Sequence, residues 1–144
     1  MRPDQTTEAE VNAALDRILV AYADRDMDAL VAACVPDADL SMFGTGADER
    51  RVGLSEVQAQ AMRDWGQSEA ASFSLPWRHI SGAGNVAWVA AEGSASVRAG
   101  GQDMSLPIRM TTVFERRDGR WLLAHMHASV PFMAQEEGQS FPTQ

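Results

Sequence analysis

The second half of the chain consists of four runs in which apolar and polar residues alternate, and this alternation constrains the fold more than any other feature. The runs cover residues 72–80, 86–98, 104–117 and 120–130, and turns that contain glycine separate them. Alternation with a period of two is typical of strands that bury one face. Asp118-Gly119, between the last two runs, is the strongest hairpin signal in the chain. The second half is therefore expected to form an antiparallel sheet.

The first half of the chain shows helical periodicity instead. Apolar residues recur every three or four positions over residues 11–22, and Thr7 begins a capping box before them. Shorter helices are expected at residues 26–33 and 55–66, with a short strand at 39–43 between them. Helices that precede an antiparallel sheet predict an α+β fold, with the helices on one face of a curved sheet.

Length and apolar runs bound the organisation of the chain. Its 144 residues contain no internal repeat or linker, which predicts one domain over residues 1–131 and a polar tail over 132–144. The longest apolar runs, about six residues, are too short to span a bilayer or to form the core of a signal peptide. The single cysteine, Cys34, cannot form an intramolecular disulfide. These features predict a soluble, cytoplasmic protein.

The charged residues exclude several kinds of chemistry. All 12 basic residues are arginines, so Schiff-base catalysis, a phosphate-loop lysine and a lysine general base are excluded. The 20 acidic residues give a formal net charge of −8. Such an acidic chain lacks the positive surface that binds nucleic acids and anionic membranes, so neither partner is expected.

The last alternating run carries residue types that are common in functional sites. One of its faces carries Trp121, Leu123, His125, His127 and Ser129, and the other carries Leu122, Ala124, Met126 and Ala128. We expect the first face to form a pocket wall, because imidazoles and a hydroxyl follow an apolar base. The second face is apolar throughout, so we expect a second subunit to cover it and form a homodimer.

The two histidines of this run have alternative roles. His127 is either a general base or hydrogen-bond donor in the pocket, or a core histidine bonded to Ser129 or to a neighbouring strand. His125 is a candidate ligand contact. The two Cα atoms lie about 7 Å apart by strand geometry, and His79 could complete a metal site. No cluster of acidic and histidine residues accompanies them, so no metal is expected.

Two charged residues lie within the neighbouring runs. Arg109 interrupts an apolar run, and burial of an arginine requires an anion or several acceptors. It is either the anchor for a ligand carboxylate or the partner of an internal acid such as Glu92 or Asp39. If Glu92 faces inward, burial would raise its pKa and suit it to proton transfer, whereas an outward Glu92 is a solvated acid.

The aromatic residues can supply the wall of a cavity. Five of them are candidates for lining a pocket sized for an aromatic or polycyclic ligand: Tyr22, Phe43, Trp65, Trp77 and Trp88. The alternative is that they are ordinary core residues, of which two or three contact a ligand.

The final hairpin resembles that of a known group. The stretch from Met110 through Arg116-Arg117-Asp118-Gly119 to Trp121, followed by His125-Met126-His127-Ala128-Ser129, looks like the closing hairpin of the SnoaL-like group of the nuclear transport factor 2-like superfamily. It is also similar to the association domain of calcium/calmodulin-dependent protein kinase II. With the upstream helices, the resemblance covers about residues 7–131. It implies a cone-shaped half-barrel, in which a bent, mostly antiparallel sheet wraps around a long N-terminal helix with two further helices. It also implies a pocket inside the cone and a dimer formed through the outer face of the sheet.

This resemblance implies more than one function. The superfamily includes ketosteroid isomerases, polyketide cyclases, epoxide hydrolases and dehydratases, and also non-catalytic domains. An alignment through residues 36–39 puts the base of the isomerases near Met42, which cannot accept a proton, and their tyrosine near Ile18, one turn before Tyr22. Isomerisation by the usual steroid machinery is therefore not expected.

Two hypotheses follow from the sequence. In the first, the chain is a cofactor-free isomerase, cyclase or dehydratase that acts on a small hydrophobic carbonyl compound. His127 or Glu92 moves the proton, and Arg109 and Tyr22 polarise an oxygen. In the second, the chain is a non-catalytic ligand-binding or oligomerisation domain, in which Arg109 and His127 hold a small carboxylate or are structural. Neither hypothesis needs a cofactor.

Overall fold

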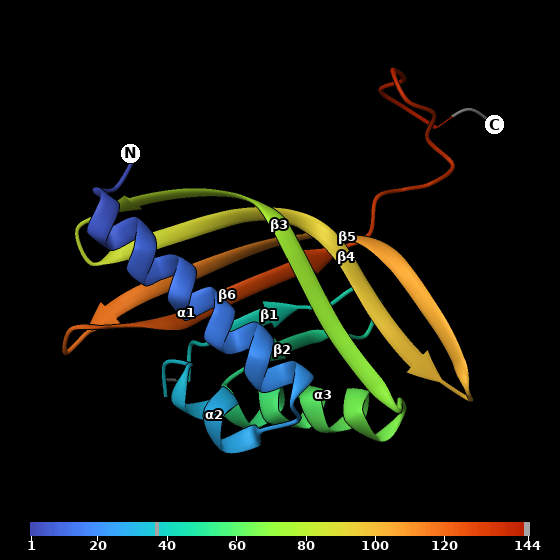
Figure 1. The fold of residues 1–144 in the computed structure, drawn as a ribbon, viewed down its shortest axis with the longest axis horizontal. Helices are drawn as coiled ribbons and strands as arrows, with labels where there is room; N and C mark the ends of the chain where they lie inside the picture. Colours follow the sequence, from blue (N-terminus) through green and yellow to red (C-terminus); the bar gives the residue numbers. More distant parts are fainter. Residues whose placement is uncertain (37, 143–144) are drawn as a thin grey trace.

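The computed structural model describes residues 1–36 and 38–142, which form three helices around a six-stranded sheet. The helices are α1 (Gln5–Ala23), α2 (Met27–Ala32) and α3 (Leu54–Gly66). The strands are β1 (Ser41–Phe43), β2 (Arg50–Val52), β3 (Ala70–Ala83), β4 (Val86–Ala99), β5 (Gln102–Arg117) and β6 (Arg120–Ser129). Figure 1 shows α1 lying along the concave side of the curved sheet, with α2 and α3 beside its C-terminal end. The expected α+β fold, a bent sheet around a long N-terminal helix, is confirmed.

The strand order of the sheet is β2-β1-β6-β5-β4-β3. The four long strands pair antiparallel with their neighbours in sequence, as their alternating residues predict. β1 runs parallel to β6, which makes the sheet mixed. The short β2 was not expected from the sequence, and it pairs with β1 at one edge. Beyond β6, the described residues up to 142 form turns and irregular structure.

Acidic side chains fix where the first two helices begin. Asp4 accepts a hydrogen bond of 2.7 Å from the backbone N–H of Thr7, so α1 begins at Gln5. The capping box expected at Thr7 is therefore wrong, because the chain is already helical there. Asp26 caps α2 in the same way, through the N–H of Ala29 at 3.0 Å. None of the helices in the described ranges is long and apolar enough to cross a membrane.

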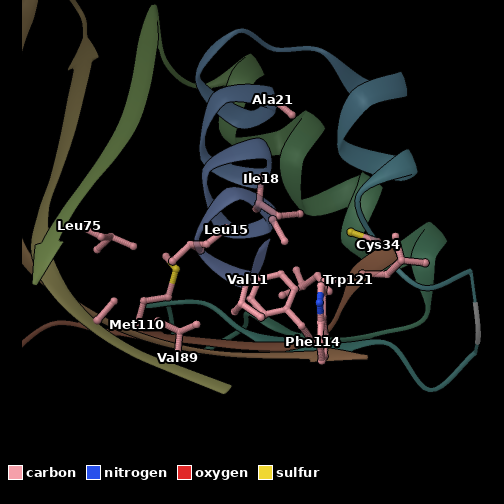
Figure 2. Packing of buried hydrophobic residues seen from close by; sticks show 14 of the residues in the cluster. Val11, Leu15, Ile18, Ala21, Cys34, Leu75, Val89, Met110, Phe114 and Trp121 are labelled. Atoms are coloured by element: carbon pink, nitrogen blue, oxygen red, sulfur yellow. The ribbon is translucent and has the colours of Figure 1, made fainter. Parts of the chain in front are cut away.

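The core lies between α1 and the concave face of the sheet. The buried face of α1 consists of Val11, Ala14, Leu15, Ile18 and Ala21, at the spacing that the sequence predicts. Met110 and Phe114 of β5 lie opposite this face, and both are almost fully buried. Trp121 of β6 joins them and donates its indole N–H to Glu10 of α1 at 3.0 Å. Figure 2 shows these apolar side chains meeting between the helix and the strands.

The pairing of β3 with β4 is irregular at one point. The register shifts between Ser74 and Trp77, where Pro76 interrupts the ladder. Gly93 of β4 lies opposite, and a Cβ placed on it would stand 1.8 Å from the carbonyl oxygen of Ser74. The backbone of β3 can approach β4 this closely only because residue 93 has no side chain.

A second irregularity, in β6, decides which residues of that strand face the helices. Val113 of β5 pairs with His125, but the next residue, Phe114, pairs with Leu123, so Ala124 is an extra residue in the ladder. An extra residue reverses the alternation of inward and outward side chains beyond it. The expected unbroken alternation along this strand is therefore wrong.

Candidate functional site

A cavity of about 340 Å³ lies between the helices and the concave face of the sheet. Residues from all three helices and from β1, β3, β4, β5 and β6 line it. Most of the wall is apolar, including Ile18, Phe73, Val97, Ile108, Met110 and Met126. A cavity of this size and character suits a small apolar molecule.

Polar side chains meet at one end of the cavity. Gln60 and Asp64 lie four residues apart on α3, so they project from the same side of the helix. Tyr22 comes from the last turn of α1, and Glu49 comes from the loop before β2. Hydrogen bonds connect these four side chains to one another. The polar end of the cavity, defined here as Tyr22, Glu49, Gln60 and Asp64, is therefore built from helices and a loop rather than from the long strands.

The centre of the polar end is a hydrogen-bonded pair. The hydroxyl of Tyr22 donates to Oδ2 of Asp64 at 2.8 Å. The tyrosine ring packs against Phe73 and Trp65, with ring centroids 5.3 Å and 6.0 Å away. Burial, together with the neighbouring charge of Asp64, raises the pKa of Tyr22 far above its usual value. Tyr22 therefore keeps its proton at neutral pH and holds the Asp64 carboxylate in place.

Gln60 joins two carboxylates. Its side chain is almost fully buried, and its Oε1 accepts a hydrogen bond of 2.9 Å from Nε of Arg51. This contact fixes the orientation of the amide, because only its oxygen can accept. The amide nitrogen then donates to Glu49 at 2.9 Å and to Asp64 at 2.7 Å. Both hydrogens of the amide nitrogen are therefore engaged by carboxylates.

The two carboxylates differ in how their charge is balanced. Glu49 forms an ion pair of 3.0 Å with Arg63, which also pairs with Asp48 at 2.7 Å. The carboxylate of Asp64 receives hydrogen bonds only from the neutral groups of Tyr22 and Gln60 among the described residues. Asp64 is thus a carboxylate at an apolar cavity that has no ion-pair partner among the described residues.

Of the five aromatic residues expected to line a pocket, only Tyr22 lines this cavity. Trp65 supports Tyr22 from outside the cavity, and its indole N–H donates to the tyrosine backbone carbonyl at 3.1 Å. Phe43, Trp77 and Trp88 are exposed and lie on the convex face of the sheet. The expectation that these three residues line the pocket is therefore wrong, because neighbouring residues of their strands face the helices instead.

The histidines expected in the pocket also lie on the convex face. The bulge at Ala124 turns Met126 and Ala128 toward the cavity, and His125 and His127 away from it. His125 shares a 2.9 Å hydrogen bond with Ser41, and the exposed His127 lies against the Phe43 ring at 5.3 Å. The expectation that these imidazoles form the pocket wall is wrong for this reason.

The charged pair of the central strands lies outside as well. Arg109 binds Glu92 through Nε at 3.1 Å, and both side chains are more than half exposed. Their neighbours Met110 and Ala91 occupy the inner face instead. Of the alternatives for Arg109, the structure has the ion pair with Glu92 rather than a ligand anchor at the cavity. Glu92 is the solvated acid that an outward orientation predicts.

Three residues of the polar end were not predicted from the sequence: Glu49, Gln60 and Asp64. The sequence contained a signal for two of them. Val57 and Ala61 lie on the apolar side of α3, and the polar residues Gln60 and Asp64 interrupt this side. Glu49 lies in a loop, and no periodicity could place it.

Three further residues named from the sequence, Ile18, Met42 and Cys34, line the cavity. Ile18 and Met42, the positions that the resemblance aligns with the isomerase tyrosine and base, both line it and are both apolar. Cys34 also lines it, and burial raises the pKa of its thiol to about 11. Within the described ranges, no group of three or more histidine, cysteine or acidic side chains is placed to hold a metal ion.

The fold is similar to several solved structures. A proposed dehydratase of the nuclear transport factor 2-like family from Streptomyces avermitilis is 23% identical with a TM-score of 0.81, over 88% of this chain and 98% of that chain. A proposed scytalone dehydratase from Novosphingobium aromaticivorans is 12% identical with a TM-score of 0.78, over 88% and 85% of the two chains. A proposed calcium/calmodulin-dependent protein kinase II association domain from Xanthomonas campestris is 21% identical with a TM-score of 0.72, over 86% and 87%. At these identities the likeness shows the fold and assigns no reaction.

The sequence itself identifies the family. No curated protein matches it. The family model described as a SnoaL-like domain, however, matches residues 11–133. This match spans most of the chain and includes the closing hairpin that carries the resemblance. The chain therefore belongs to the SnoaL-like domain family, with a nuclear transport factor 2-like fold.

Proposed function

We propose that the chain binds a small, largely apolar carbonyl compound in the cavity and transfers a proton on it without a cofactor, as an isomerase, cyclase or dehydratase. One observation carries this proposal: Asp64 is a carboxylate held by Tyr22 at the wall of an apolar cavity, and it forms no ion pair with any of the described residues. Two structures of similar fold are named proposed dehydratases, which supports the reaction class.

The chemistry assigns the base role to Asp64. Its carboxylate takes a proton from the carbon next to the carbonyl, and the electron pair of that C–H bond forms an enolate. In an isomerase, the resulting carboxylic acid returns the proton to another carbon. In a dehydratase, the electron pair expels a β-hydroxyl group, which takes the proton and leaves as water. Tyr22 orients the base in both cases, because its own hydroxyl hydrogen is donated to Asp64.

Proton exchange tests this proposal without knowledge of the natural substrate. The protein is incubated in deuterium oxide with a panel of small cyclic and aromatic ketones, and loss of the α-proton signal is followed by proton NMR. We expect exchange with the unmodified protein and a fall of at least about a hundredfold in Asp64→Asn. Asp103→Asn, the same change at an exposed carboxylate, is the matched control and keeps full activity.

Variants of the convex face complete this experiment. Glu92→Gln and His127→Gln change the two residues that the sequence suggested as the proton-transferring group. If either of them abolished exchange while Asp64→Asn retained it, the base would lie on the convex face and the proposal would be wrong. Absence of exchange with every ketone would also count against it.

A second candidate property is association of two copies through the convex face. The observation that favours it is a set of exposed apolar side chains on this face: Phe43, Val52, Trp77, Val86 and Trp88. Trp77 is 57% exposed, which is unusual for a tryptophan on a protein without a partner. A fold shared with a proposed kinase association domain is consistent with this role.

Sedimentation tests the association. We expect a dimer at micromolar concentration, and a monomer after the double substitution Trp77→Arg and Trp88→Arg. Met62→Arg, at an exposed methionine of α3, is the matched control and leaves the dimer intact. A monomer at all concentrations of the unmodified protein would contradict the proposal.

A further inference from the structure

We infer that the cavity binds the polar group of its ligand as a hydrogen-bond donor, a hydroxyl or an ammonium group on an apolar body, and that it rejects anions. This inference concerns the same cavity as the proposed function and adds the class of ligand to it. It replaces the carboxylate ligand that the sequence suggested through Arg109.

The first argument is the charge of the wall. The described residues that line the cavity include two carboxylates, Glu49 and Asp64, and no arginine or histidine. The arginines around the polar end have other partners. Arg63 binds Asp48 and Glu49, and Arg51 binds Gln60. Arg25 binds the backbone carbonyls of Trp65 and Ser68 and the Ser68 hydroxyl. An anionic ligand would therefore meet a like charge at Asp64, in surroundings that screen charge poorly.

The second argument is that the donors at the polar end are already engaged. The hydroxyl of Tyr22 donates to Asp64, and both hydrogens of the Gln60 amide go to carboxylates. Ser68, also on the wall, donates its hydroxyl to the backbone carbonyl of Asp64 at 2.7 Å. An acceptor of the ligand that is placed against Tyr22 or Gln60 would therefore have to break one of these bonds.

The third argument is the spare capacity of Asp64. Each carboxylate oxygen can accept two hydrogen bonds, and each oxygen of Asp64 accepts one from the described residues, Oδ1 from Gln60 and Oδ2 from Tyr22. A donor on the ligand can fill a remaining position without displacing Tyr22 or Gln60. The apolar wall then holds the body of the ligand, and Asp64 selects its polar group.

This inference is compatible with proton transfer at the same carboxylate. A ligand hydroxyl that donates a hydrogen bond to Asp64 is of the kind that a dehydratase removes. This hydroxyl would lie against the carboxylate that we propose as the base. The ligand class of the inference therefore includes β-hydroxy ketones.

A series of ligands with one apolar body tests the inference. Binding of 1-naphthylmethanol, 1-naphthylmethylamine, 1-methylnaphthalene and 1-naphthylacetate is measured by calorimetry or by tryptophan fluorescence at pH 7. We expect the alcohol and the ammonium compound to bind at least about tenfold more tightly than the hydrocarbon, which is typical of a charge-assisted hydrogen bond. We expect the carboxylate to bind at least about tenfold more weakly than the hydrocarbon.

Substitution of Asp64 tests where the discrimination arises. In Asp64→Asn, the preference for the ammonium compound falls to less than threefold and the carboxylate gains affinity. Asp103→Asn keeps the order of the unmodified protein, because this residue is exposed, is ion-paired with Arg98 and does not line the cavity. Asp64→Ala provides a second variant, and thermal unfolding verifies that each variant is folded.

Several outcomes would overturn the inference. These are binding of the carboxylate as tightly as the alcohol, an unchanged order in folded Asp64 variants, and failure of all four compounds to bind. Its failure is distinguishable from failure of the proposed function, because the titrations measure binding alone. The expected order of affinities without any proton exchange would keep the inference and reject the enzymatic proposal.

Discussion

The two faces of the single sheet carry different chemistry. The convex face holds the residue types that usually suggest a functional site: His125, His127, Trp77 and the pair of Arg109 with Glu92. The concave face contributes mainly apolar side chains to the cavity, and its polar end comes from α1, α3 and a loop. A reactive or charged side chain on a strand is therefore a weak indication of a functional site until the face of the sheet on which it lies is known.

In two strands, a single irregular residue decides which side chains point toward the helices. In β6 the extra residue Ala124 exchanges the inward and outward positions. In β3 the change of register lies opposite Gly93. Substitutions at these irregular points and at matched positions of the two faces therefore test how the faces differ.

The largest effect is expected from Gly93→Ala. A Cβ at this position would overlap the carbonyl oxygen of Ser74, at 1.8 Å, and backbone atoms cannot move aside cheaply. We expect a loss of more than about 4 kcal/mol of unfolding free energy, or no soluble protein. Gly66→Ala is the matched control, because a Cβ at the end of α3 meets nothing within 4 Å. A cooperative urea transition of Gly93→Ala near that of the unmodified protein would contradict the role of this close approach.

Adjacent residues of β5 compare the two faces directly. Phe114 is fully buried against the core, whereas Val113 beside it is half-buried on the convex face. We expect Phe114→Ala to cost about 3–5 kcal/mol and Val113→Ala about 1 kcal/mol in urea unfolding. Equal costs would mean that the convex face is as tightly packed as the core. That result would itself indicate a partner on this face.

The sequence predicted the elements of the fold better than the site. The four alternating runs, the Asp118-Gly119 turn and the helical spacing of residues 11–22 depend on local chemistry, and the structure has strands, a hairpin and a helix at these places. The faces of β6 depend on a bulge, which arises from pairing between strands and leaves no mark in the alternation of one strand. For the candidate site, the sequence named Tyr22 but not its partner Asp64, because the two lie 42 residues apart and meet only when α3 packs against α1.

Alkaline pH provides a selective test of the cavity. The chain has no lysine, one tyrosine and one cysteine, so Tyr22 and Cys34, both at the cavity, are the side chains that titrate between about pH 8.5 and 12 in the unfolded chain. Burial raises the pKa of Cys34 to about 11 and also raises the pKa of Tyr22. A raised pKa in the folded state gives stability that is complete below the unfolded pKa and is lost as pH rises through the folded pKa.

We therefore expect the unfolding free energy to fall above about pH 9, by about 2–3 kcal/mol from Cys34 by pH 11, and further from Tyr22 above about pH 10. Cys34→Ala removes the first part of this fall and Tyr22→Phe removes the second. Urea unfolding at intervals from pH 8 to pH 11.5 measures both. A flat profile for the unmodified protein would mean that water reaches both groups freely in the folded state.

The smallest effect concerns a polar group on the inner face. Thr112 is 1% exposed, and its hydroxyl has no hydrogen-bond partner among the described residues. Valine has the same shape without the unsatisfied hydroxyl, so we expect Thr112→Val to raise the unfolding free energy by about 1 kcal/mol. Thr111→Val, the neighbouring exposed position on the convex face, is the control and changes it by less than about 0.5 kcal/mol. If Thr112→Val instead destabilised the protein, the hydroxyl would have a partner such as a buried water, and the concave face would carry a polar group of its own beside the cavity.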